Sequence, residues 1–251
     1  MTLPRQFFLY SSLFFLGCST VPPEHLQTFQ NAQSAFDAGN YRQSATLYEN
    51  LIEHGVQSGT VYYNLGNAWA RADEPAHAVV AYYLARRYIP GDPHLNANLR
   101  TVLVSHGEPP PLPERSLIGS MFFWQDWMGC ETKIWLSLAL AALTSLGGIC
   151  CLFRQSKWLK RCLIGTAILT AITLASVGSD WYRYEGTEWV IVTTDALPRK
   201  GNSEQYEPTF VSSIPFGTLA VVLDERNGWY LLRFPSGQDG WLPQSQTLSL
   251  R

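Results

Sequence analysis

The chain has 251 residues, 46% hydrophobic and only 15% charged, with a net charge of −2. That length is enough for more than one folded segment, and the near-neutral charge argues against nucleic acid as a partner. The five histidines are scattered through the first half of the chain without ligand spacing, and no phosphate-cradling glycine loop occurs. The sequence therefore predicts a protein without metal, cofactor or catalytic residues, and not an enzyme.

Residues 1–18 have the pattern of a bacterial export signal. Arg5 precedes a short apolar run, Phe7–Leu16, which ends in Leu16-Gly17-Cys18-Ser19. This ending resembles a lipoprotein cleavage box, with Phe15 where a smaller aliphatic residue is usual. Cys18 is the candidate lipidated residue; ordinary cleavage and an uncleaved anchor stay open as alternatives. In each case the segment that follows is exported, because the basic start stays inside.

Residues 26–106 carry an internal repeat with a period of about 34 residues, which is the period of helix-pair repeats. The matched positions are Ala32 with Gly66, Ser44 with Ala78, Tyr48 with Tyr82, and Leu51 with Ala85. Small residues allow two antiparallel helices to cross closely, and Pro90 ends the second helix of its pair. The pattern predicts two helix pairs, followed by a partial third helix over His94–Val104 that caps the stack.

The second unit resembles the tetratricopeptide repeat. Its matching residues are Tyr62-Tyr63-Asn64-Leu65-Gly66-Asn67-Ala68-Trp69, Ala78, Tyr82, Ala85 and Pro90. The first unit departs from the pattern in having Ser44 where the family has Ala. The resemblance implies a concave protein-binding face lined by the first helix of each pair. The implied lining residues are Phe29, Gln33, Tyr63, Asn64, Asn67 and Arg71. Alternatively, the asparagines are solvated helix surface and the aromatic residues pack between repeats.

Residues 107–132 form a predicted linker. Its first part is rich in proline, typical of a semi-rigid polyproline II spacer. Its second part is crowded with large apolar residues: Phe122, Phe123, Trp124, Trp127 and Met128. We interpret this part as an interfacial segment on the outer leaflet of a membrane; a docking surface for a partner span is the alternative.

Two uncharged apolar stretches, residues 134–153 and 162–179, flank a basic loop at residues 154–161. A helix of about 20 residues matches a hydrocarbon core about 30 Å thick. We therefore predict a two-span transmembrane hairpin; the alternative is a buried hairpin in a soluble domain. The loop carries Arg154, Lys157, Lys160 and Arg161. These cations place the loop in the cytoplasm and both flanking segments outside.

Residues 187–251 are predicted to be all-β. The expected strands are Trp189–Thr193, Thr218–Leu223, Trp229–Phe234 and Gly240–Leu242. The motifs Pro215-Phe216-Gly217-Thr218, Asn227-Gly228-Trp229-Tyr230 and Asp239-Gly240-Trp241-Leu242 resemble bacterial SH3-like barrels. Leu197-Pro198, before Arg199, departs from that pattern. Trp229 and Trp241 are assigned to the core, so the expected ligand contacts are Arg199, Tyr206 and Phe210.

The complete order of segments resembles the BatE-type proteins of the bacterial aerotolerance operon. The predicted fold is multi-domain: all-α tetratricopeptide repeats, a two-helix transmembrane hairpin and an all-β SH3-like barrel. The resemblance implies envelope partners, namely von Willebrand factor A-type membrane proteins and a MoxR-type ATPase system. The leading hypothesis is a non-catalytic scaffold on the outer face of the cytoplasmic membrane. The rival hypothesis is a cell-wall sensor or targeting subunit whose SH3-like barrel binds peptidoglycan.

Overall fold

The computed structural model describes residues 21–107, 124, 127–154 and 156–250. The predicted export signal with Cys18, most of the proline-rich spacer and Phe122 and Phe123 lie outside these residues. The chain divides into two compact units. The first comprises residues 1–116 and 188–251, and the second comprises residues 117–187, so the second is an insertion in the sequence of the first.

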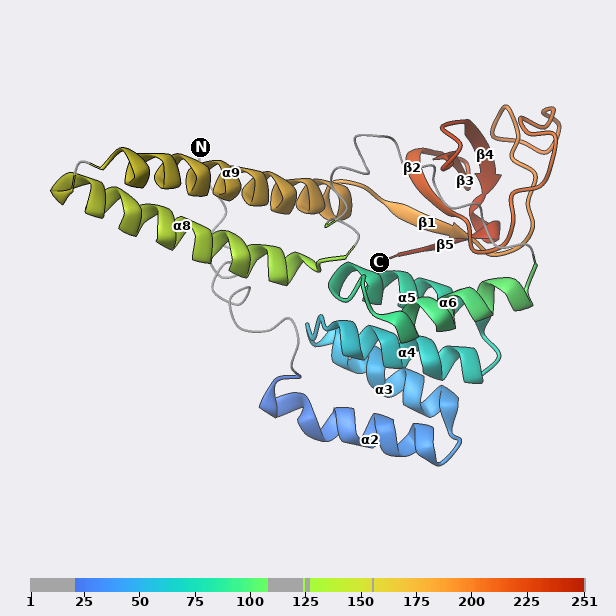
Figure 1. Ribbon diagram of the computed structural model, residues 1–251. Coiled ribbons are helices and arrows are strands. Elements are labelled where there is room, and N and C mark those ends of the chain that lie inside the picture. Colours follow the sequence, from blue (N-terminus) through green and yellow to red (C-terminus); the bar gives the residue numbers. More distant parts are fainter. Residues whose placement is uncertain (1–20, 108–123, 125–126, 155, 251) are drawn as a thin grey trace, which may run out of the picture. The chain divides into compact units, whose positions relative to one another are not determined.

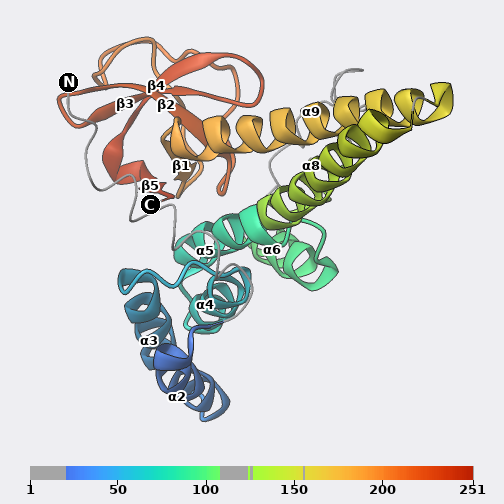
Figure 2. The ribbon, with the colours of Figure 1, turned by 90° about the vertical axis from the view of Figure 1, so that its left-hand side faces the viewer.

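The amino-terminal part of the first unit is a series of antiparallel helices (Figure 1). After a short 3₁₀ helix, η1 (Pro23–His25), come α2 (Leu26–Asp37), α3 (Tyr41–Glu53), α4 (Gly59–Arg71), α5 (Pro75–Tyr88) and α6 (Pro93–Ser105). Each helix packs on the next along the chain, as Figure 2 shows from a second side. Helix α5 begins one repeat period after α3, and α6 begins one repeat period after α4. The sequence period is therefore the period of the helices.

Two close crossings hold the helix pairs together. In the second pair Gly66 faces Tyr82, and a Cβ added at Gly66 would lie 2.5 Å from two ring carbons of that tyrosine. In the first pair the hydroxyl of Ser44 donates a hydrogen bond of 2.8 Å to the carbonyl oxygen of Ala32, and both residues are fully buried. This bond satisfies the buried hydroxyl, so serine is tolerated at the position that Ala78 has in the second pair.

Gly66→Ala is expected to destabilise the first unit by about 1–3 kcal/mol. In an open helix the same change stabilises by about 1 kcal/mol, because glycine is a poor helix former. Here the Tyr82 ring is 1% exposed and cannot move away. Urea unfolding of the full chain measures the effect, and an increase in stability would contradict the close crossing.

The carboxy-terminal part of the first unit is an antiparallel sheet in the order β4-β3-β2-β1-β5. Its strands are β1 (Trp189–Val192), β2 (Leu219–Arg226), β3 (Trp229–Arg233), β4 (Asp239–Pro243) and β5 (Thr247–Ser249). The first four coincide with the expected strands to within a few residues. The turn between β2 and β3 has positive φ at both Asn227 and Gly228, as a tight hairpin requires.

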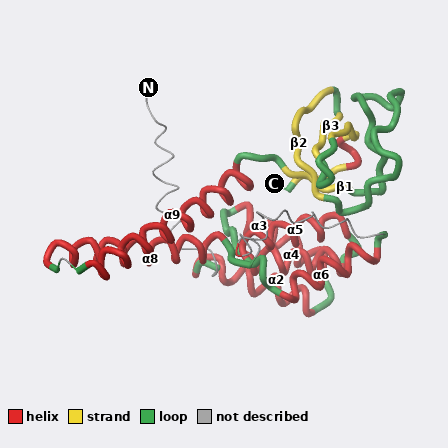
Figure 3. Tube along the Cα trace, turned by 45° about the horizontal axis from the view of Figure 1, so that its top comes forward, coloured by secondary structure: helices red, strands yellow, loops and turns green. Residues whose placement is uncertain are grey.

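The second unit contains two long helices, α8 (Cys130–Phe153) and α9 (Lys157–Glu185), which lie side by side (Figure 3). Both are long and apolar enough to cross a membrane. Only 6% of each apolar stretch is buried within the protein, which argues against the alternative of a buried hairpin. Helix α9 begins earlier than the uncharged stretch, so Lys157, Lys160 and Arg161 lie in its first turns rather than in a loop.

A buried ion pair joins α8 to α9. The Lys133 ammonium lies 2.6 Å from the Asp180 carboxylate, and the two side chains are 3% and 7% exposed. One turn along α8, the Ser137 hydroxyl donates to the Lys133 carbonyl oxygen at 2.7 Å. Both charged residues stand just outside the uncharged stretches used to predict the spans. No sequence pattern therefore indicated that they would pair.

Candidate functional site

A cluster of amide and phenol side chains connects three consecutive helices. Asn67 of α4 accepts hydrogen bonds at its Oδ1 from the Tyr82 hydroxyl of α5, at 2.9 Å, and from Nδ2 of Asn98 of α6, at 2.8 Å. The same Asn98 nitrogen lies 3.1 Å from the Tyr63 hydroxyl, to which it donates. Burial raises the pKa of Tyr82, so its hydroxyl stays protonated and serves as a donor. We call Tyr63, Asn67, Tyr82 and Asn98 the amide cluster.

A second polar contact extends this pattern toward the first helix pair. Asn64 of α4 hydrogen-bonds the Tyr48 side chain of α3. Burial raises the pKa of Tyr48 to about 12; the bond to Asn64 opposes this shift and the negative charge of Asp37 adds to it. The two asparagines that were predicted to contact a ligand are thus held in place by buried tyrosines of the second helices.

The predicted lining residues divide into two kinds. Phe29 packs edge-to-face on Tyr48, with ring centroids 5.7 Å apart, and the Tyr63 ring lies 6.2 Å from that of Tyr82. These two aromatic side chains therefore contribute to packing between helices. By contrast, Gln33 and Arg71 are exposed, and the Arg71 guanidinium lies 5.9 Å from the centre of the Tyr41 ring.

Asn98 belongs to the amide cluster but was not among the predicted residues. It stands one repeat period after Asn64, at the same place in α6 that Asn64 has in α4. Extending the period to the partial third unit would have found it. Tyr82 was recognised only as a packing residue, because its hydroxyl contact depends on how α5 lies against α4.

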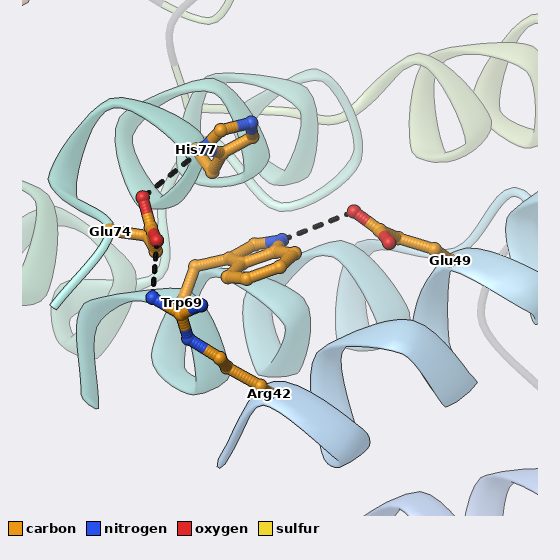
Figure 4. A network of polar contacts seen from close by, with 5 residues as sticks. All are labelled: Arg42, Glu49, Trp69, Glu74 and His77. Carbon is orange, nitrogen blue, oxygen red and sulfur yellow. Dashed lines mark hydrogen bonds and ion pairs between the residues drawn. The ribbon is translucent and has the colours of Figure 1, made fainter. Parts of the chain in front are cut away.

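A separate network joins the first helix pair to the second (Figure 4). The Arg42 guanidinium donates to the Glu74 carboxylate at 2.6 Å, and the indole nitrogen of Trp69 donates to Glu49 at 3.3 Å. The His77 ring lies 5.2 Å from the Trp69 ring and 3.9 Å from Glu74. The Arg42 side chain is 72% exposed, so the pair contributes little to stability and mainly aligns the helices.

In the sheet, the three expected contact residues lie near one loop. The Arg199 guanidinium donates to the Tyr206 carbonyl oxygen at 3.2 Å, and the Arg199 backbone pairs with Trp241 through two bonds of 2.8 Å. Tyr206 is 52% exposed. Phe210 instead packs edge-to-face on Phe234 at 5.3 Å, so it belongs mainly to the core of the sheet. Tyr206 is thus the exposed residue of the three, whereas Arg199 and Phe210 are partly buried.

Among the residues that the structure describes, no group of three or more His, Cys, Asp or Glu side chains could hold a metal ion. The candidate site is the amide cluster, whose members are neutral hydrogen-bonding groups. Comparison of the sequence with protein-family models gives no match, and comparison with curated proteins gives none either.

Proposed function

We propose that the protein is a non-catalytic scaffold anchored in the bacterial cytoplasmic membrane by α8 and α9. In this proposal the helix pairs are tetratricopeptide repeats that bind an extended segment of an envelope protein. The sheet is an SH3-like domain that binds a second ligand through Arg199 and Tyr206. The resemblance to BatE-type proteins suggests that the partners are von Willebrand factor A-type membrane proteins and a MoxR-type ATPase system, acting in envelope stress.

The observation that carries this proposal is that the segments before and after the hairpin belong to one compact unit. One folded unit cannot be divided between two sides of a membrane, so the chain between its halves must cross an even number of times. Two apolar helices meet that requirement. Arg154 before the hairpin turn and Lys157, Lys160 and Arg161 in the first turns of α9 favour a cytoplasmic position for the turn, which supports a position of the folded unit outside.

The amide cluster supports binding of a peptide backbone. A backbone presents alternating donors and acceptors, and an amide side chain offers both. Asn67 uses its oxygen for Tyr82 and Asn98, and within the described residues its nitrogen has no acceptor. Because the side chains are already fixed by these bonds, a ligand would lose little of its binding energy to ordering them.

Export of the carboxy terminus is tested by a reporter enzyme that is active only outside the cytoplasm. Fusion behind Arg251 is expected to give activity, whereas fusion at Ser156, in the hairpin turn, is expected to give none. The Ser156 fusion is the matched control for expression and leakage. Equal activity of the two fusions, or the reverse order, would contradict the proposed topology.

Partner binding is tested by a photo-crosslinking amino acid in intact cells. Placed at Gln33, an exposed position on α2, it is expected to capture one defined envelope protein. Placed at Thr46, an exposed position on α3, it should not capture that protein. Adding Asn67→Ala should reduce the yield from Gln33. No capture at Gln33, or the same products from both positions, would contradict the proposal.

A further inference from the structure

Among the residues that the structure describes, no second helix of its own repeat covers the apolar face of α6. In the two preceding units the first helix packs on a second one, α2 on α3 and α4 on α5. The sequence one repeat period after the start of α5 reads Pro109-Pro110-Pro111-Leu112-Pro113. These residues lie outside the part of the chain that the structure describes. Nevertheless Leu95, Leu99 and Leu103 of α6 are 0%, 5% and 8% exposed.

Part of the cover comes from the sheet. Ile191 of β1 and Phe216, in the turn before β2, are 0% and 6% exposed. Both belong to the hydrophobic cluster of α4, α5 and α6 and not to the separate cluster inside the sheet. Leu248 and Leu250, in and after β5, pack against the same helix cluster, and β5 lies against α5.

The turn that carries Phe216 is fixed by the sheet itself. The Phe216 amide donates to the Asp195 carboxylate at 3.0 Å, and the Gly217 amide donates to the Val192 carbonyl oxygen at 2.8 Å. Gly217 has φ of +76°, which only glycine adopts readily. Contacts within the sheet therefore fix the shape of this turn.

On its other side the turn fits closely against α5 and α6. The Tyr83 hydroxyl donates to the Gly217 carbonyl oxygen at 3.3 Å, and the His106 ring lies 5.4 Å from that of Phe216. A Cβ at Gly217 would lie 2.1 Å from Cδ2 of Leu103, so no other residue fits there without a shift. The contact between this turn and the helices thus combines buried apolar side chains, a hydrogen bond and a close backbone approach at Gly217.

We propose that the sheet is the carboxy-terminal cap of the helix stack, covering on α5 and α6 the kind of apolar surface that a second helix covers in the preceding units. The interaction surface is formed by Val79, Tyr83, Leu103 and His106, and its partner is the 215–217 turn with β1 and β5 of the same chain. The helix stack and the sheet then belong to one compact unit. This inference does not depend on which ligands they bind.

The test is hydrogen exchange followed by mass spectrometry on the full chain in detergent micelles. Phe216→Ala is expected to speed amide exchange in Leu99–Ser105 by about tenfold or more, because it uncovers the end of α6. Exchange in β3 and β4 should stay as in the wild type. The matched control is Phe210→Ala, which removes the same kind of ring from the sheet away from the helices and should leave α6 unchanged.

A reciprocal variant keeps the test decisive if Phe216→Ala also loosens the sheet. Leu103→Ala leaves the cluster inside the sheet intact and is expected to speed exchange at residues 215–219 and 247–250. Faster exchange across the interface in either variant, with the Phe210→Ala control unchanged, supports the cap. Wild-type exchange in α6 for Phe216→Ala, together with wild-type exchange at residues 215–219 for Leu103→Ala, overturns it.

Discussion

Lys133→Met is expected to destabilise the α8–α9 hairpin by about 3–5 kcal/mol, because it leaves the carboxylate of Asp180 buried without its partner. The carboxylate is 7% exposed and lies 2.6 Å from the Lys133 ammonium. In lipid, two apolar helices gain nothing from burying apolar surface against each other, so a single polar pair has a large influence on their register. Asp180→Asn should have an effect in the same direction.

The charge-swapped variant Lys133→Asp with Asp180→Lys separates pairing from side-chain size. It is expected to recover most of the lost stability, since the opposite charges again face each other. Lys157→Met, which removes an exposed cation from the same hairpin, is the control and should have little effect. SDS titration of the full chain in mild-detergent micelles measures the stability of the hairpin in each variant. Hydrogen exchange in α8 and α9 then checks the ranking of the variants. A swap no more stable than either single variant would rule out the pairing.

Tyr82→Ala is expected to destabilise the first unit by about 3–5 kcal/mol, as for other large aromatic side chains removed from a core. The ring is 1% exposed and fills the crossing at Gly66, so its loss opens a cavity between α4 and α5. Thermal unfolding of the full chain, monitored by far-ultraviolet circular dichroism, measures this effect. Tyr206→Ala, at a side chain 52% exposed, should shift stability by no more than about 0.5 kcal/mol.

Tyr82→Phe distinguishes the hydroxyl from the ring. This variant keeps the packing of the ring but removes the hydrogen-bond donor to Asn67. The free energy of unfolding of the first unit is expected to decrease by about 1 kcal/mol. With the fold retained, the orientation of Asn67 is less restricted, and capture from Gln33 in the crosslinking assay should fall. A loss as large as that of Tyr82→Ala would show that the hydroxyl, rather than the packing of the ring, dominates at this site.

Periodicity accounts for the part of the fold that was predictable. The helix-pair repeat places the helices from Leu26 to Ser105, and the uncharged stretches locate α8 and α9, because each pattern reports contacts between near neighbours in sequence. Strand β5 was not predicted, since its three residues are too few to show an alternation.

Contacts between distant residues could not be predicted in the same way. Lys133 and Asp180 are 47 positions apart, and Tyr83 and Gly217 are 134 apart. No local pattern links such residues; their proximity follows from how whole elements pack. Within the amide cluster, Tyr63 and Asn67 came from the family resemblance. The role of Asn98 required a third unit whose signature is incomplete.

The division of the first unit by the hairpin has a consequence for biosynthesis. The helix stack leaves the ribosome first, but the Phe216 turn that covers its last leucines is made much later, after both apolar helices. In the proposed topology, the stack can therefore complete its folding only once the hairpin is inserted and the terminal segment has been translocated. In that topology, failed insertion of the second span would leave the apolar end of α6 exposed, so folding of the helix stack would depend on correct insertion of the hairpin.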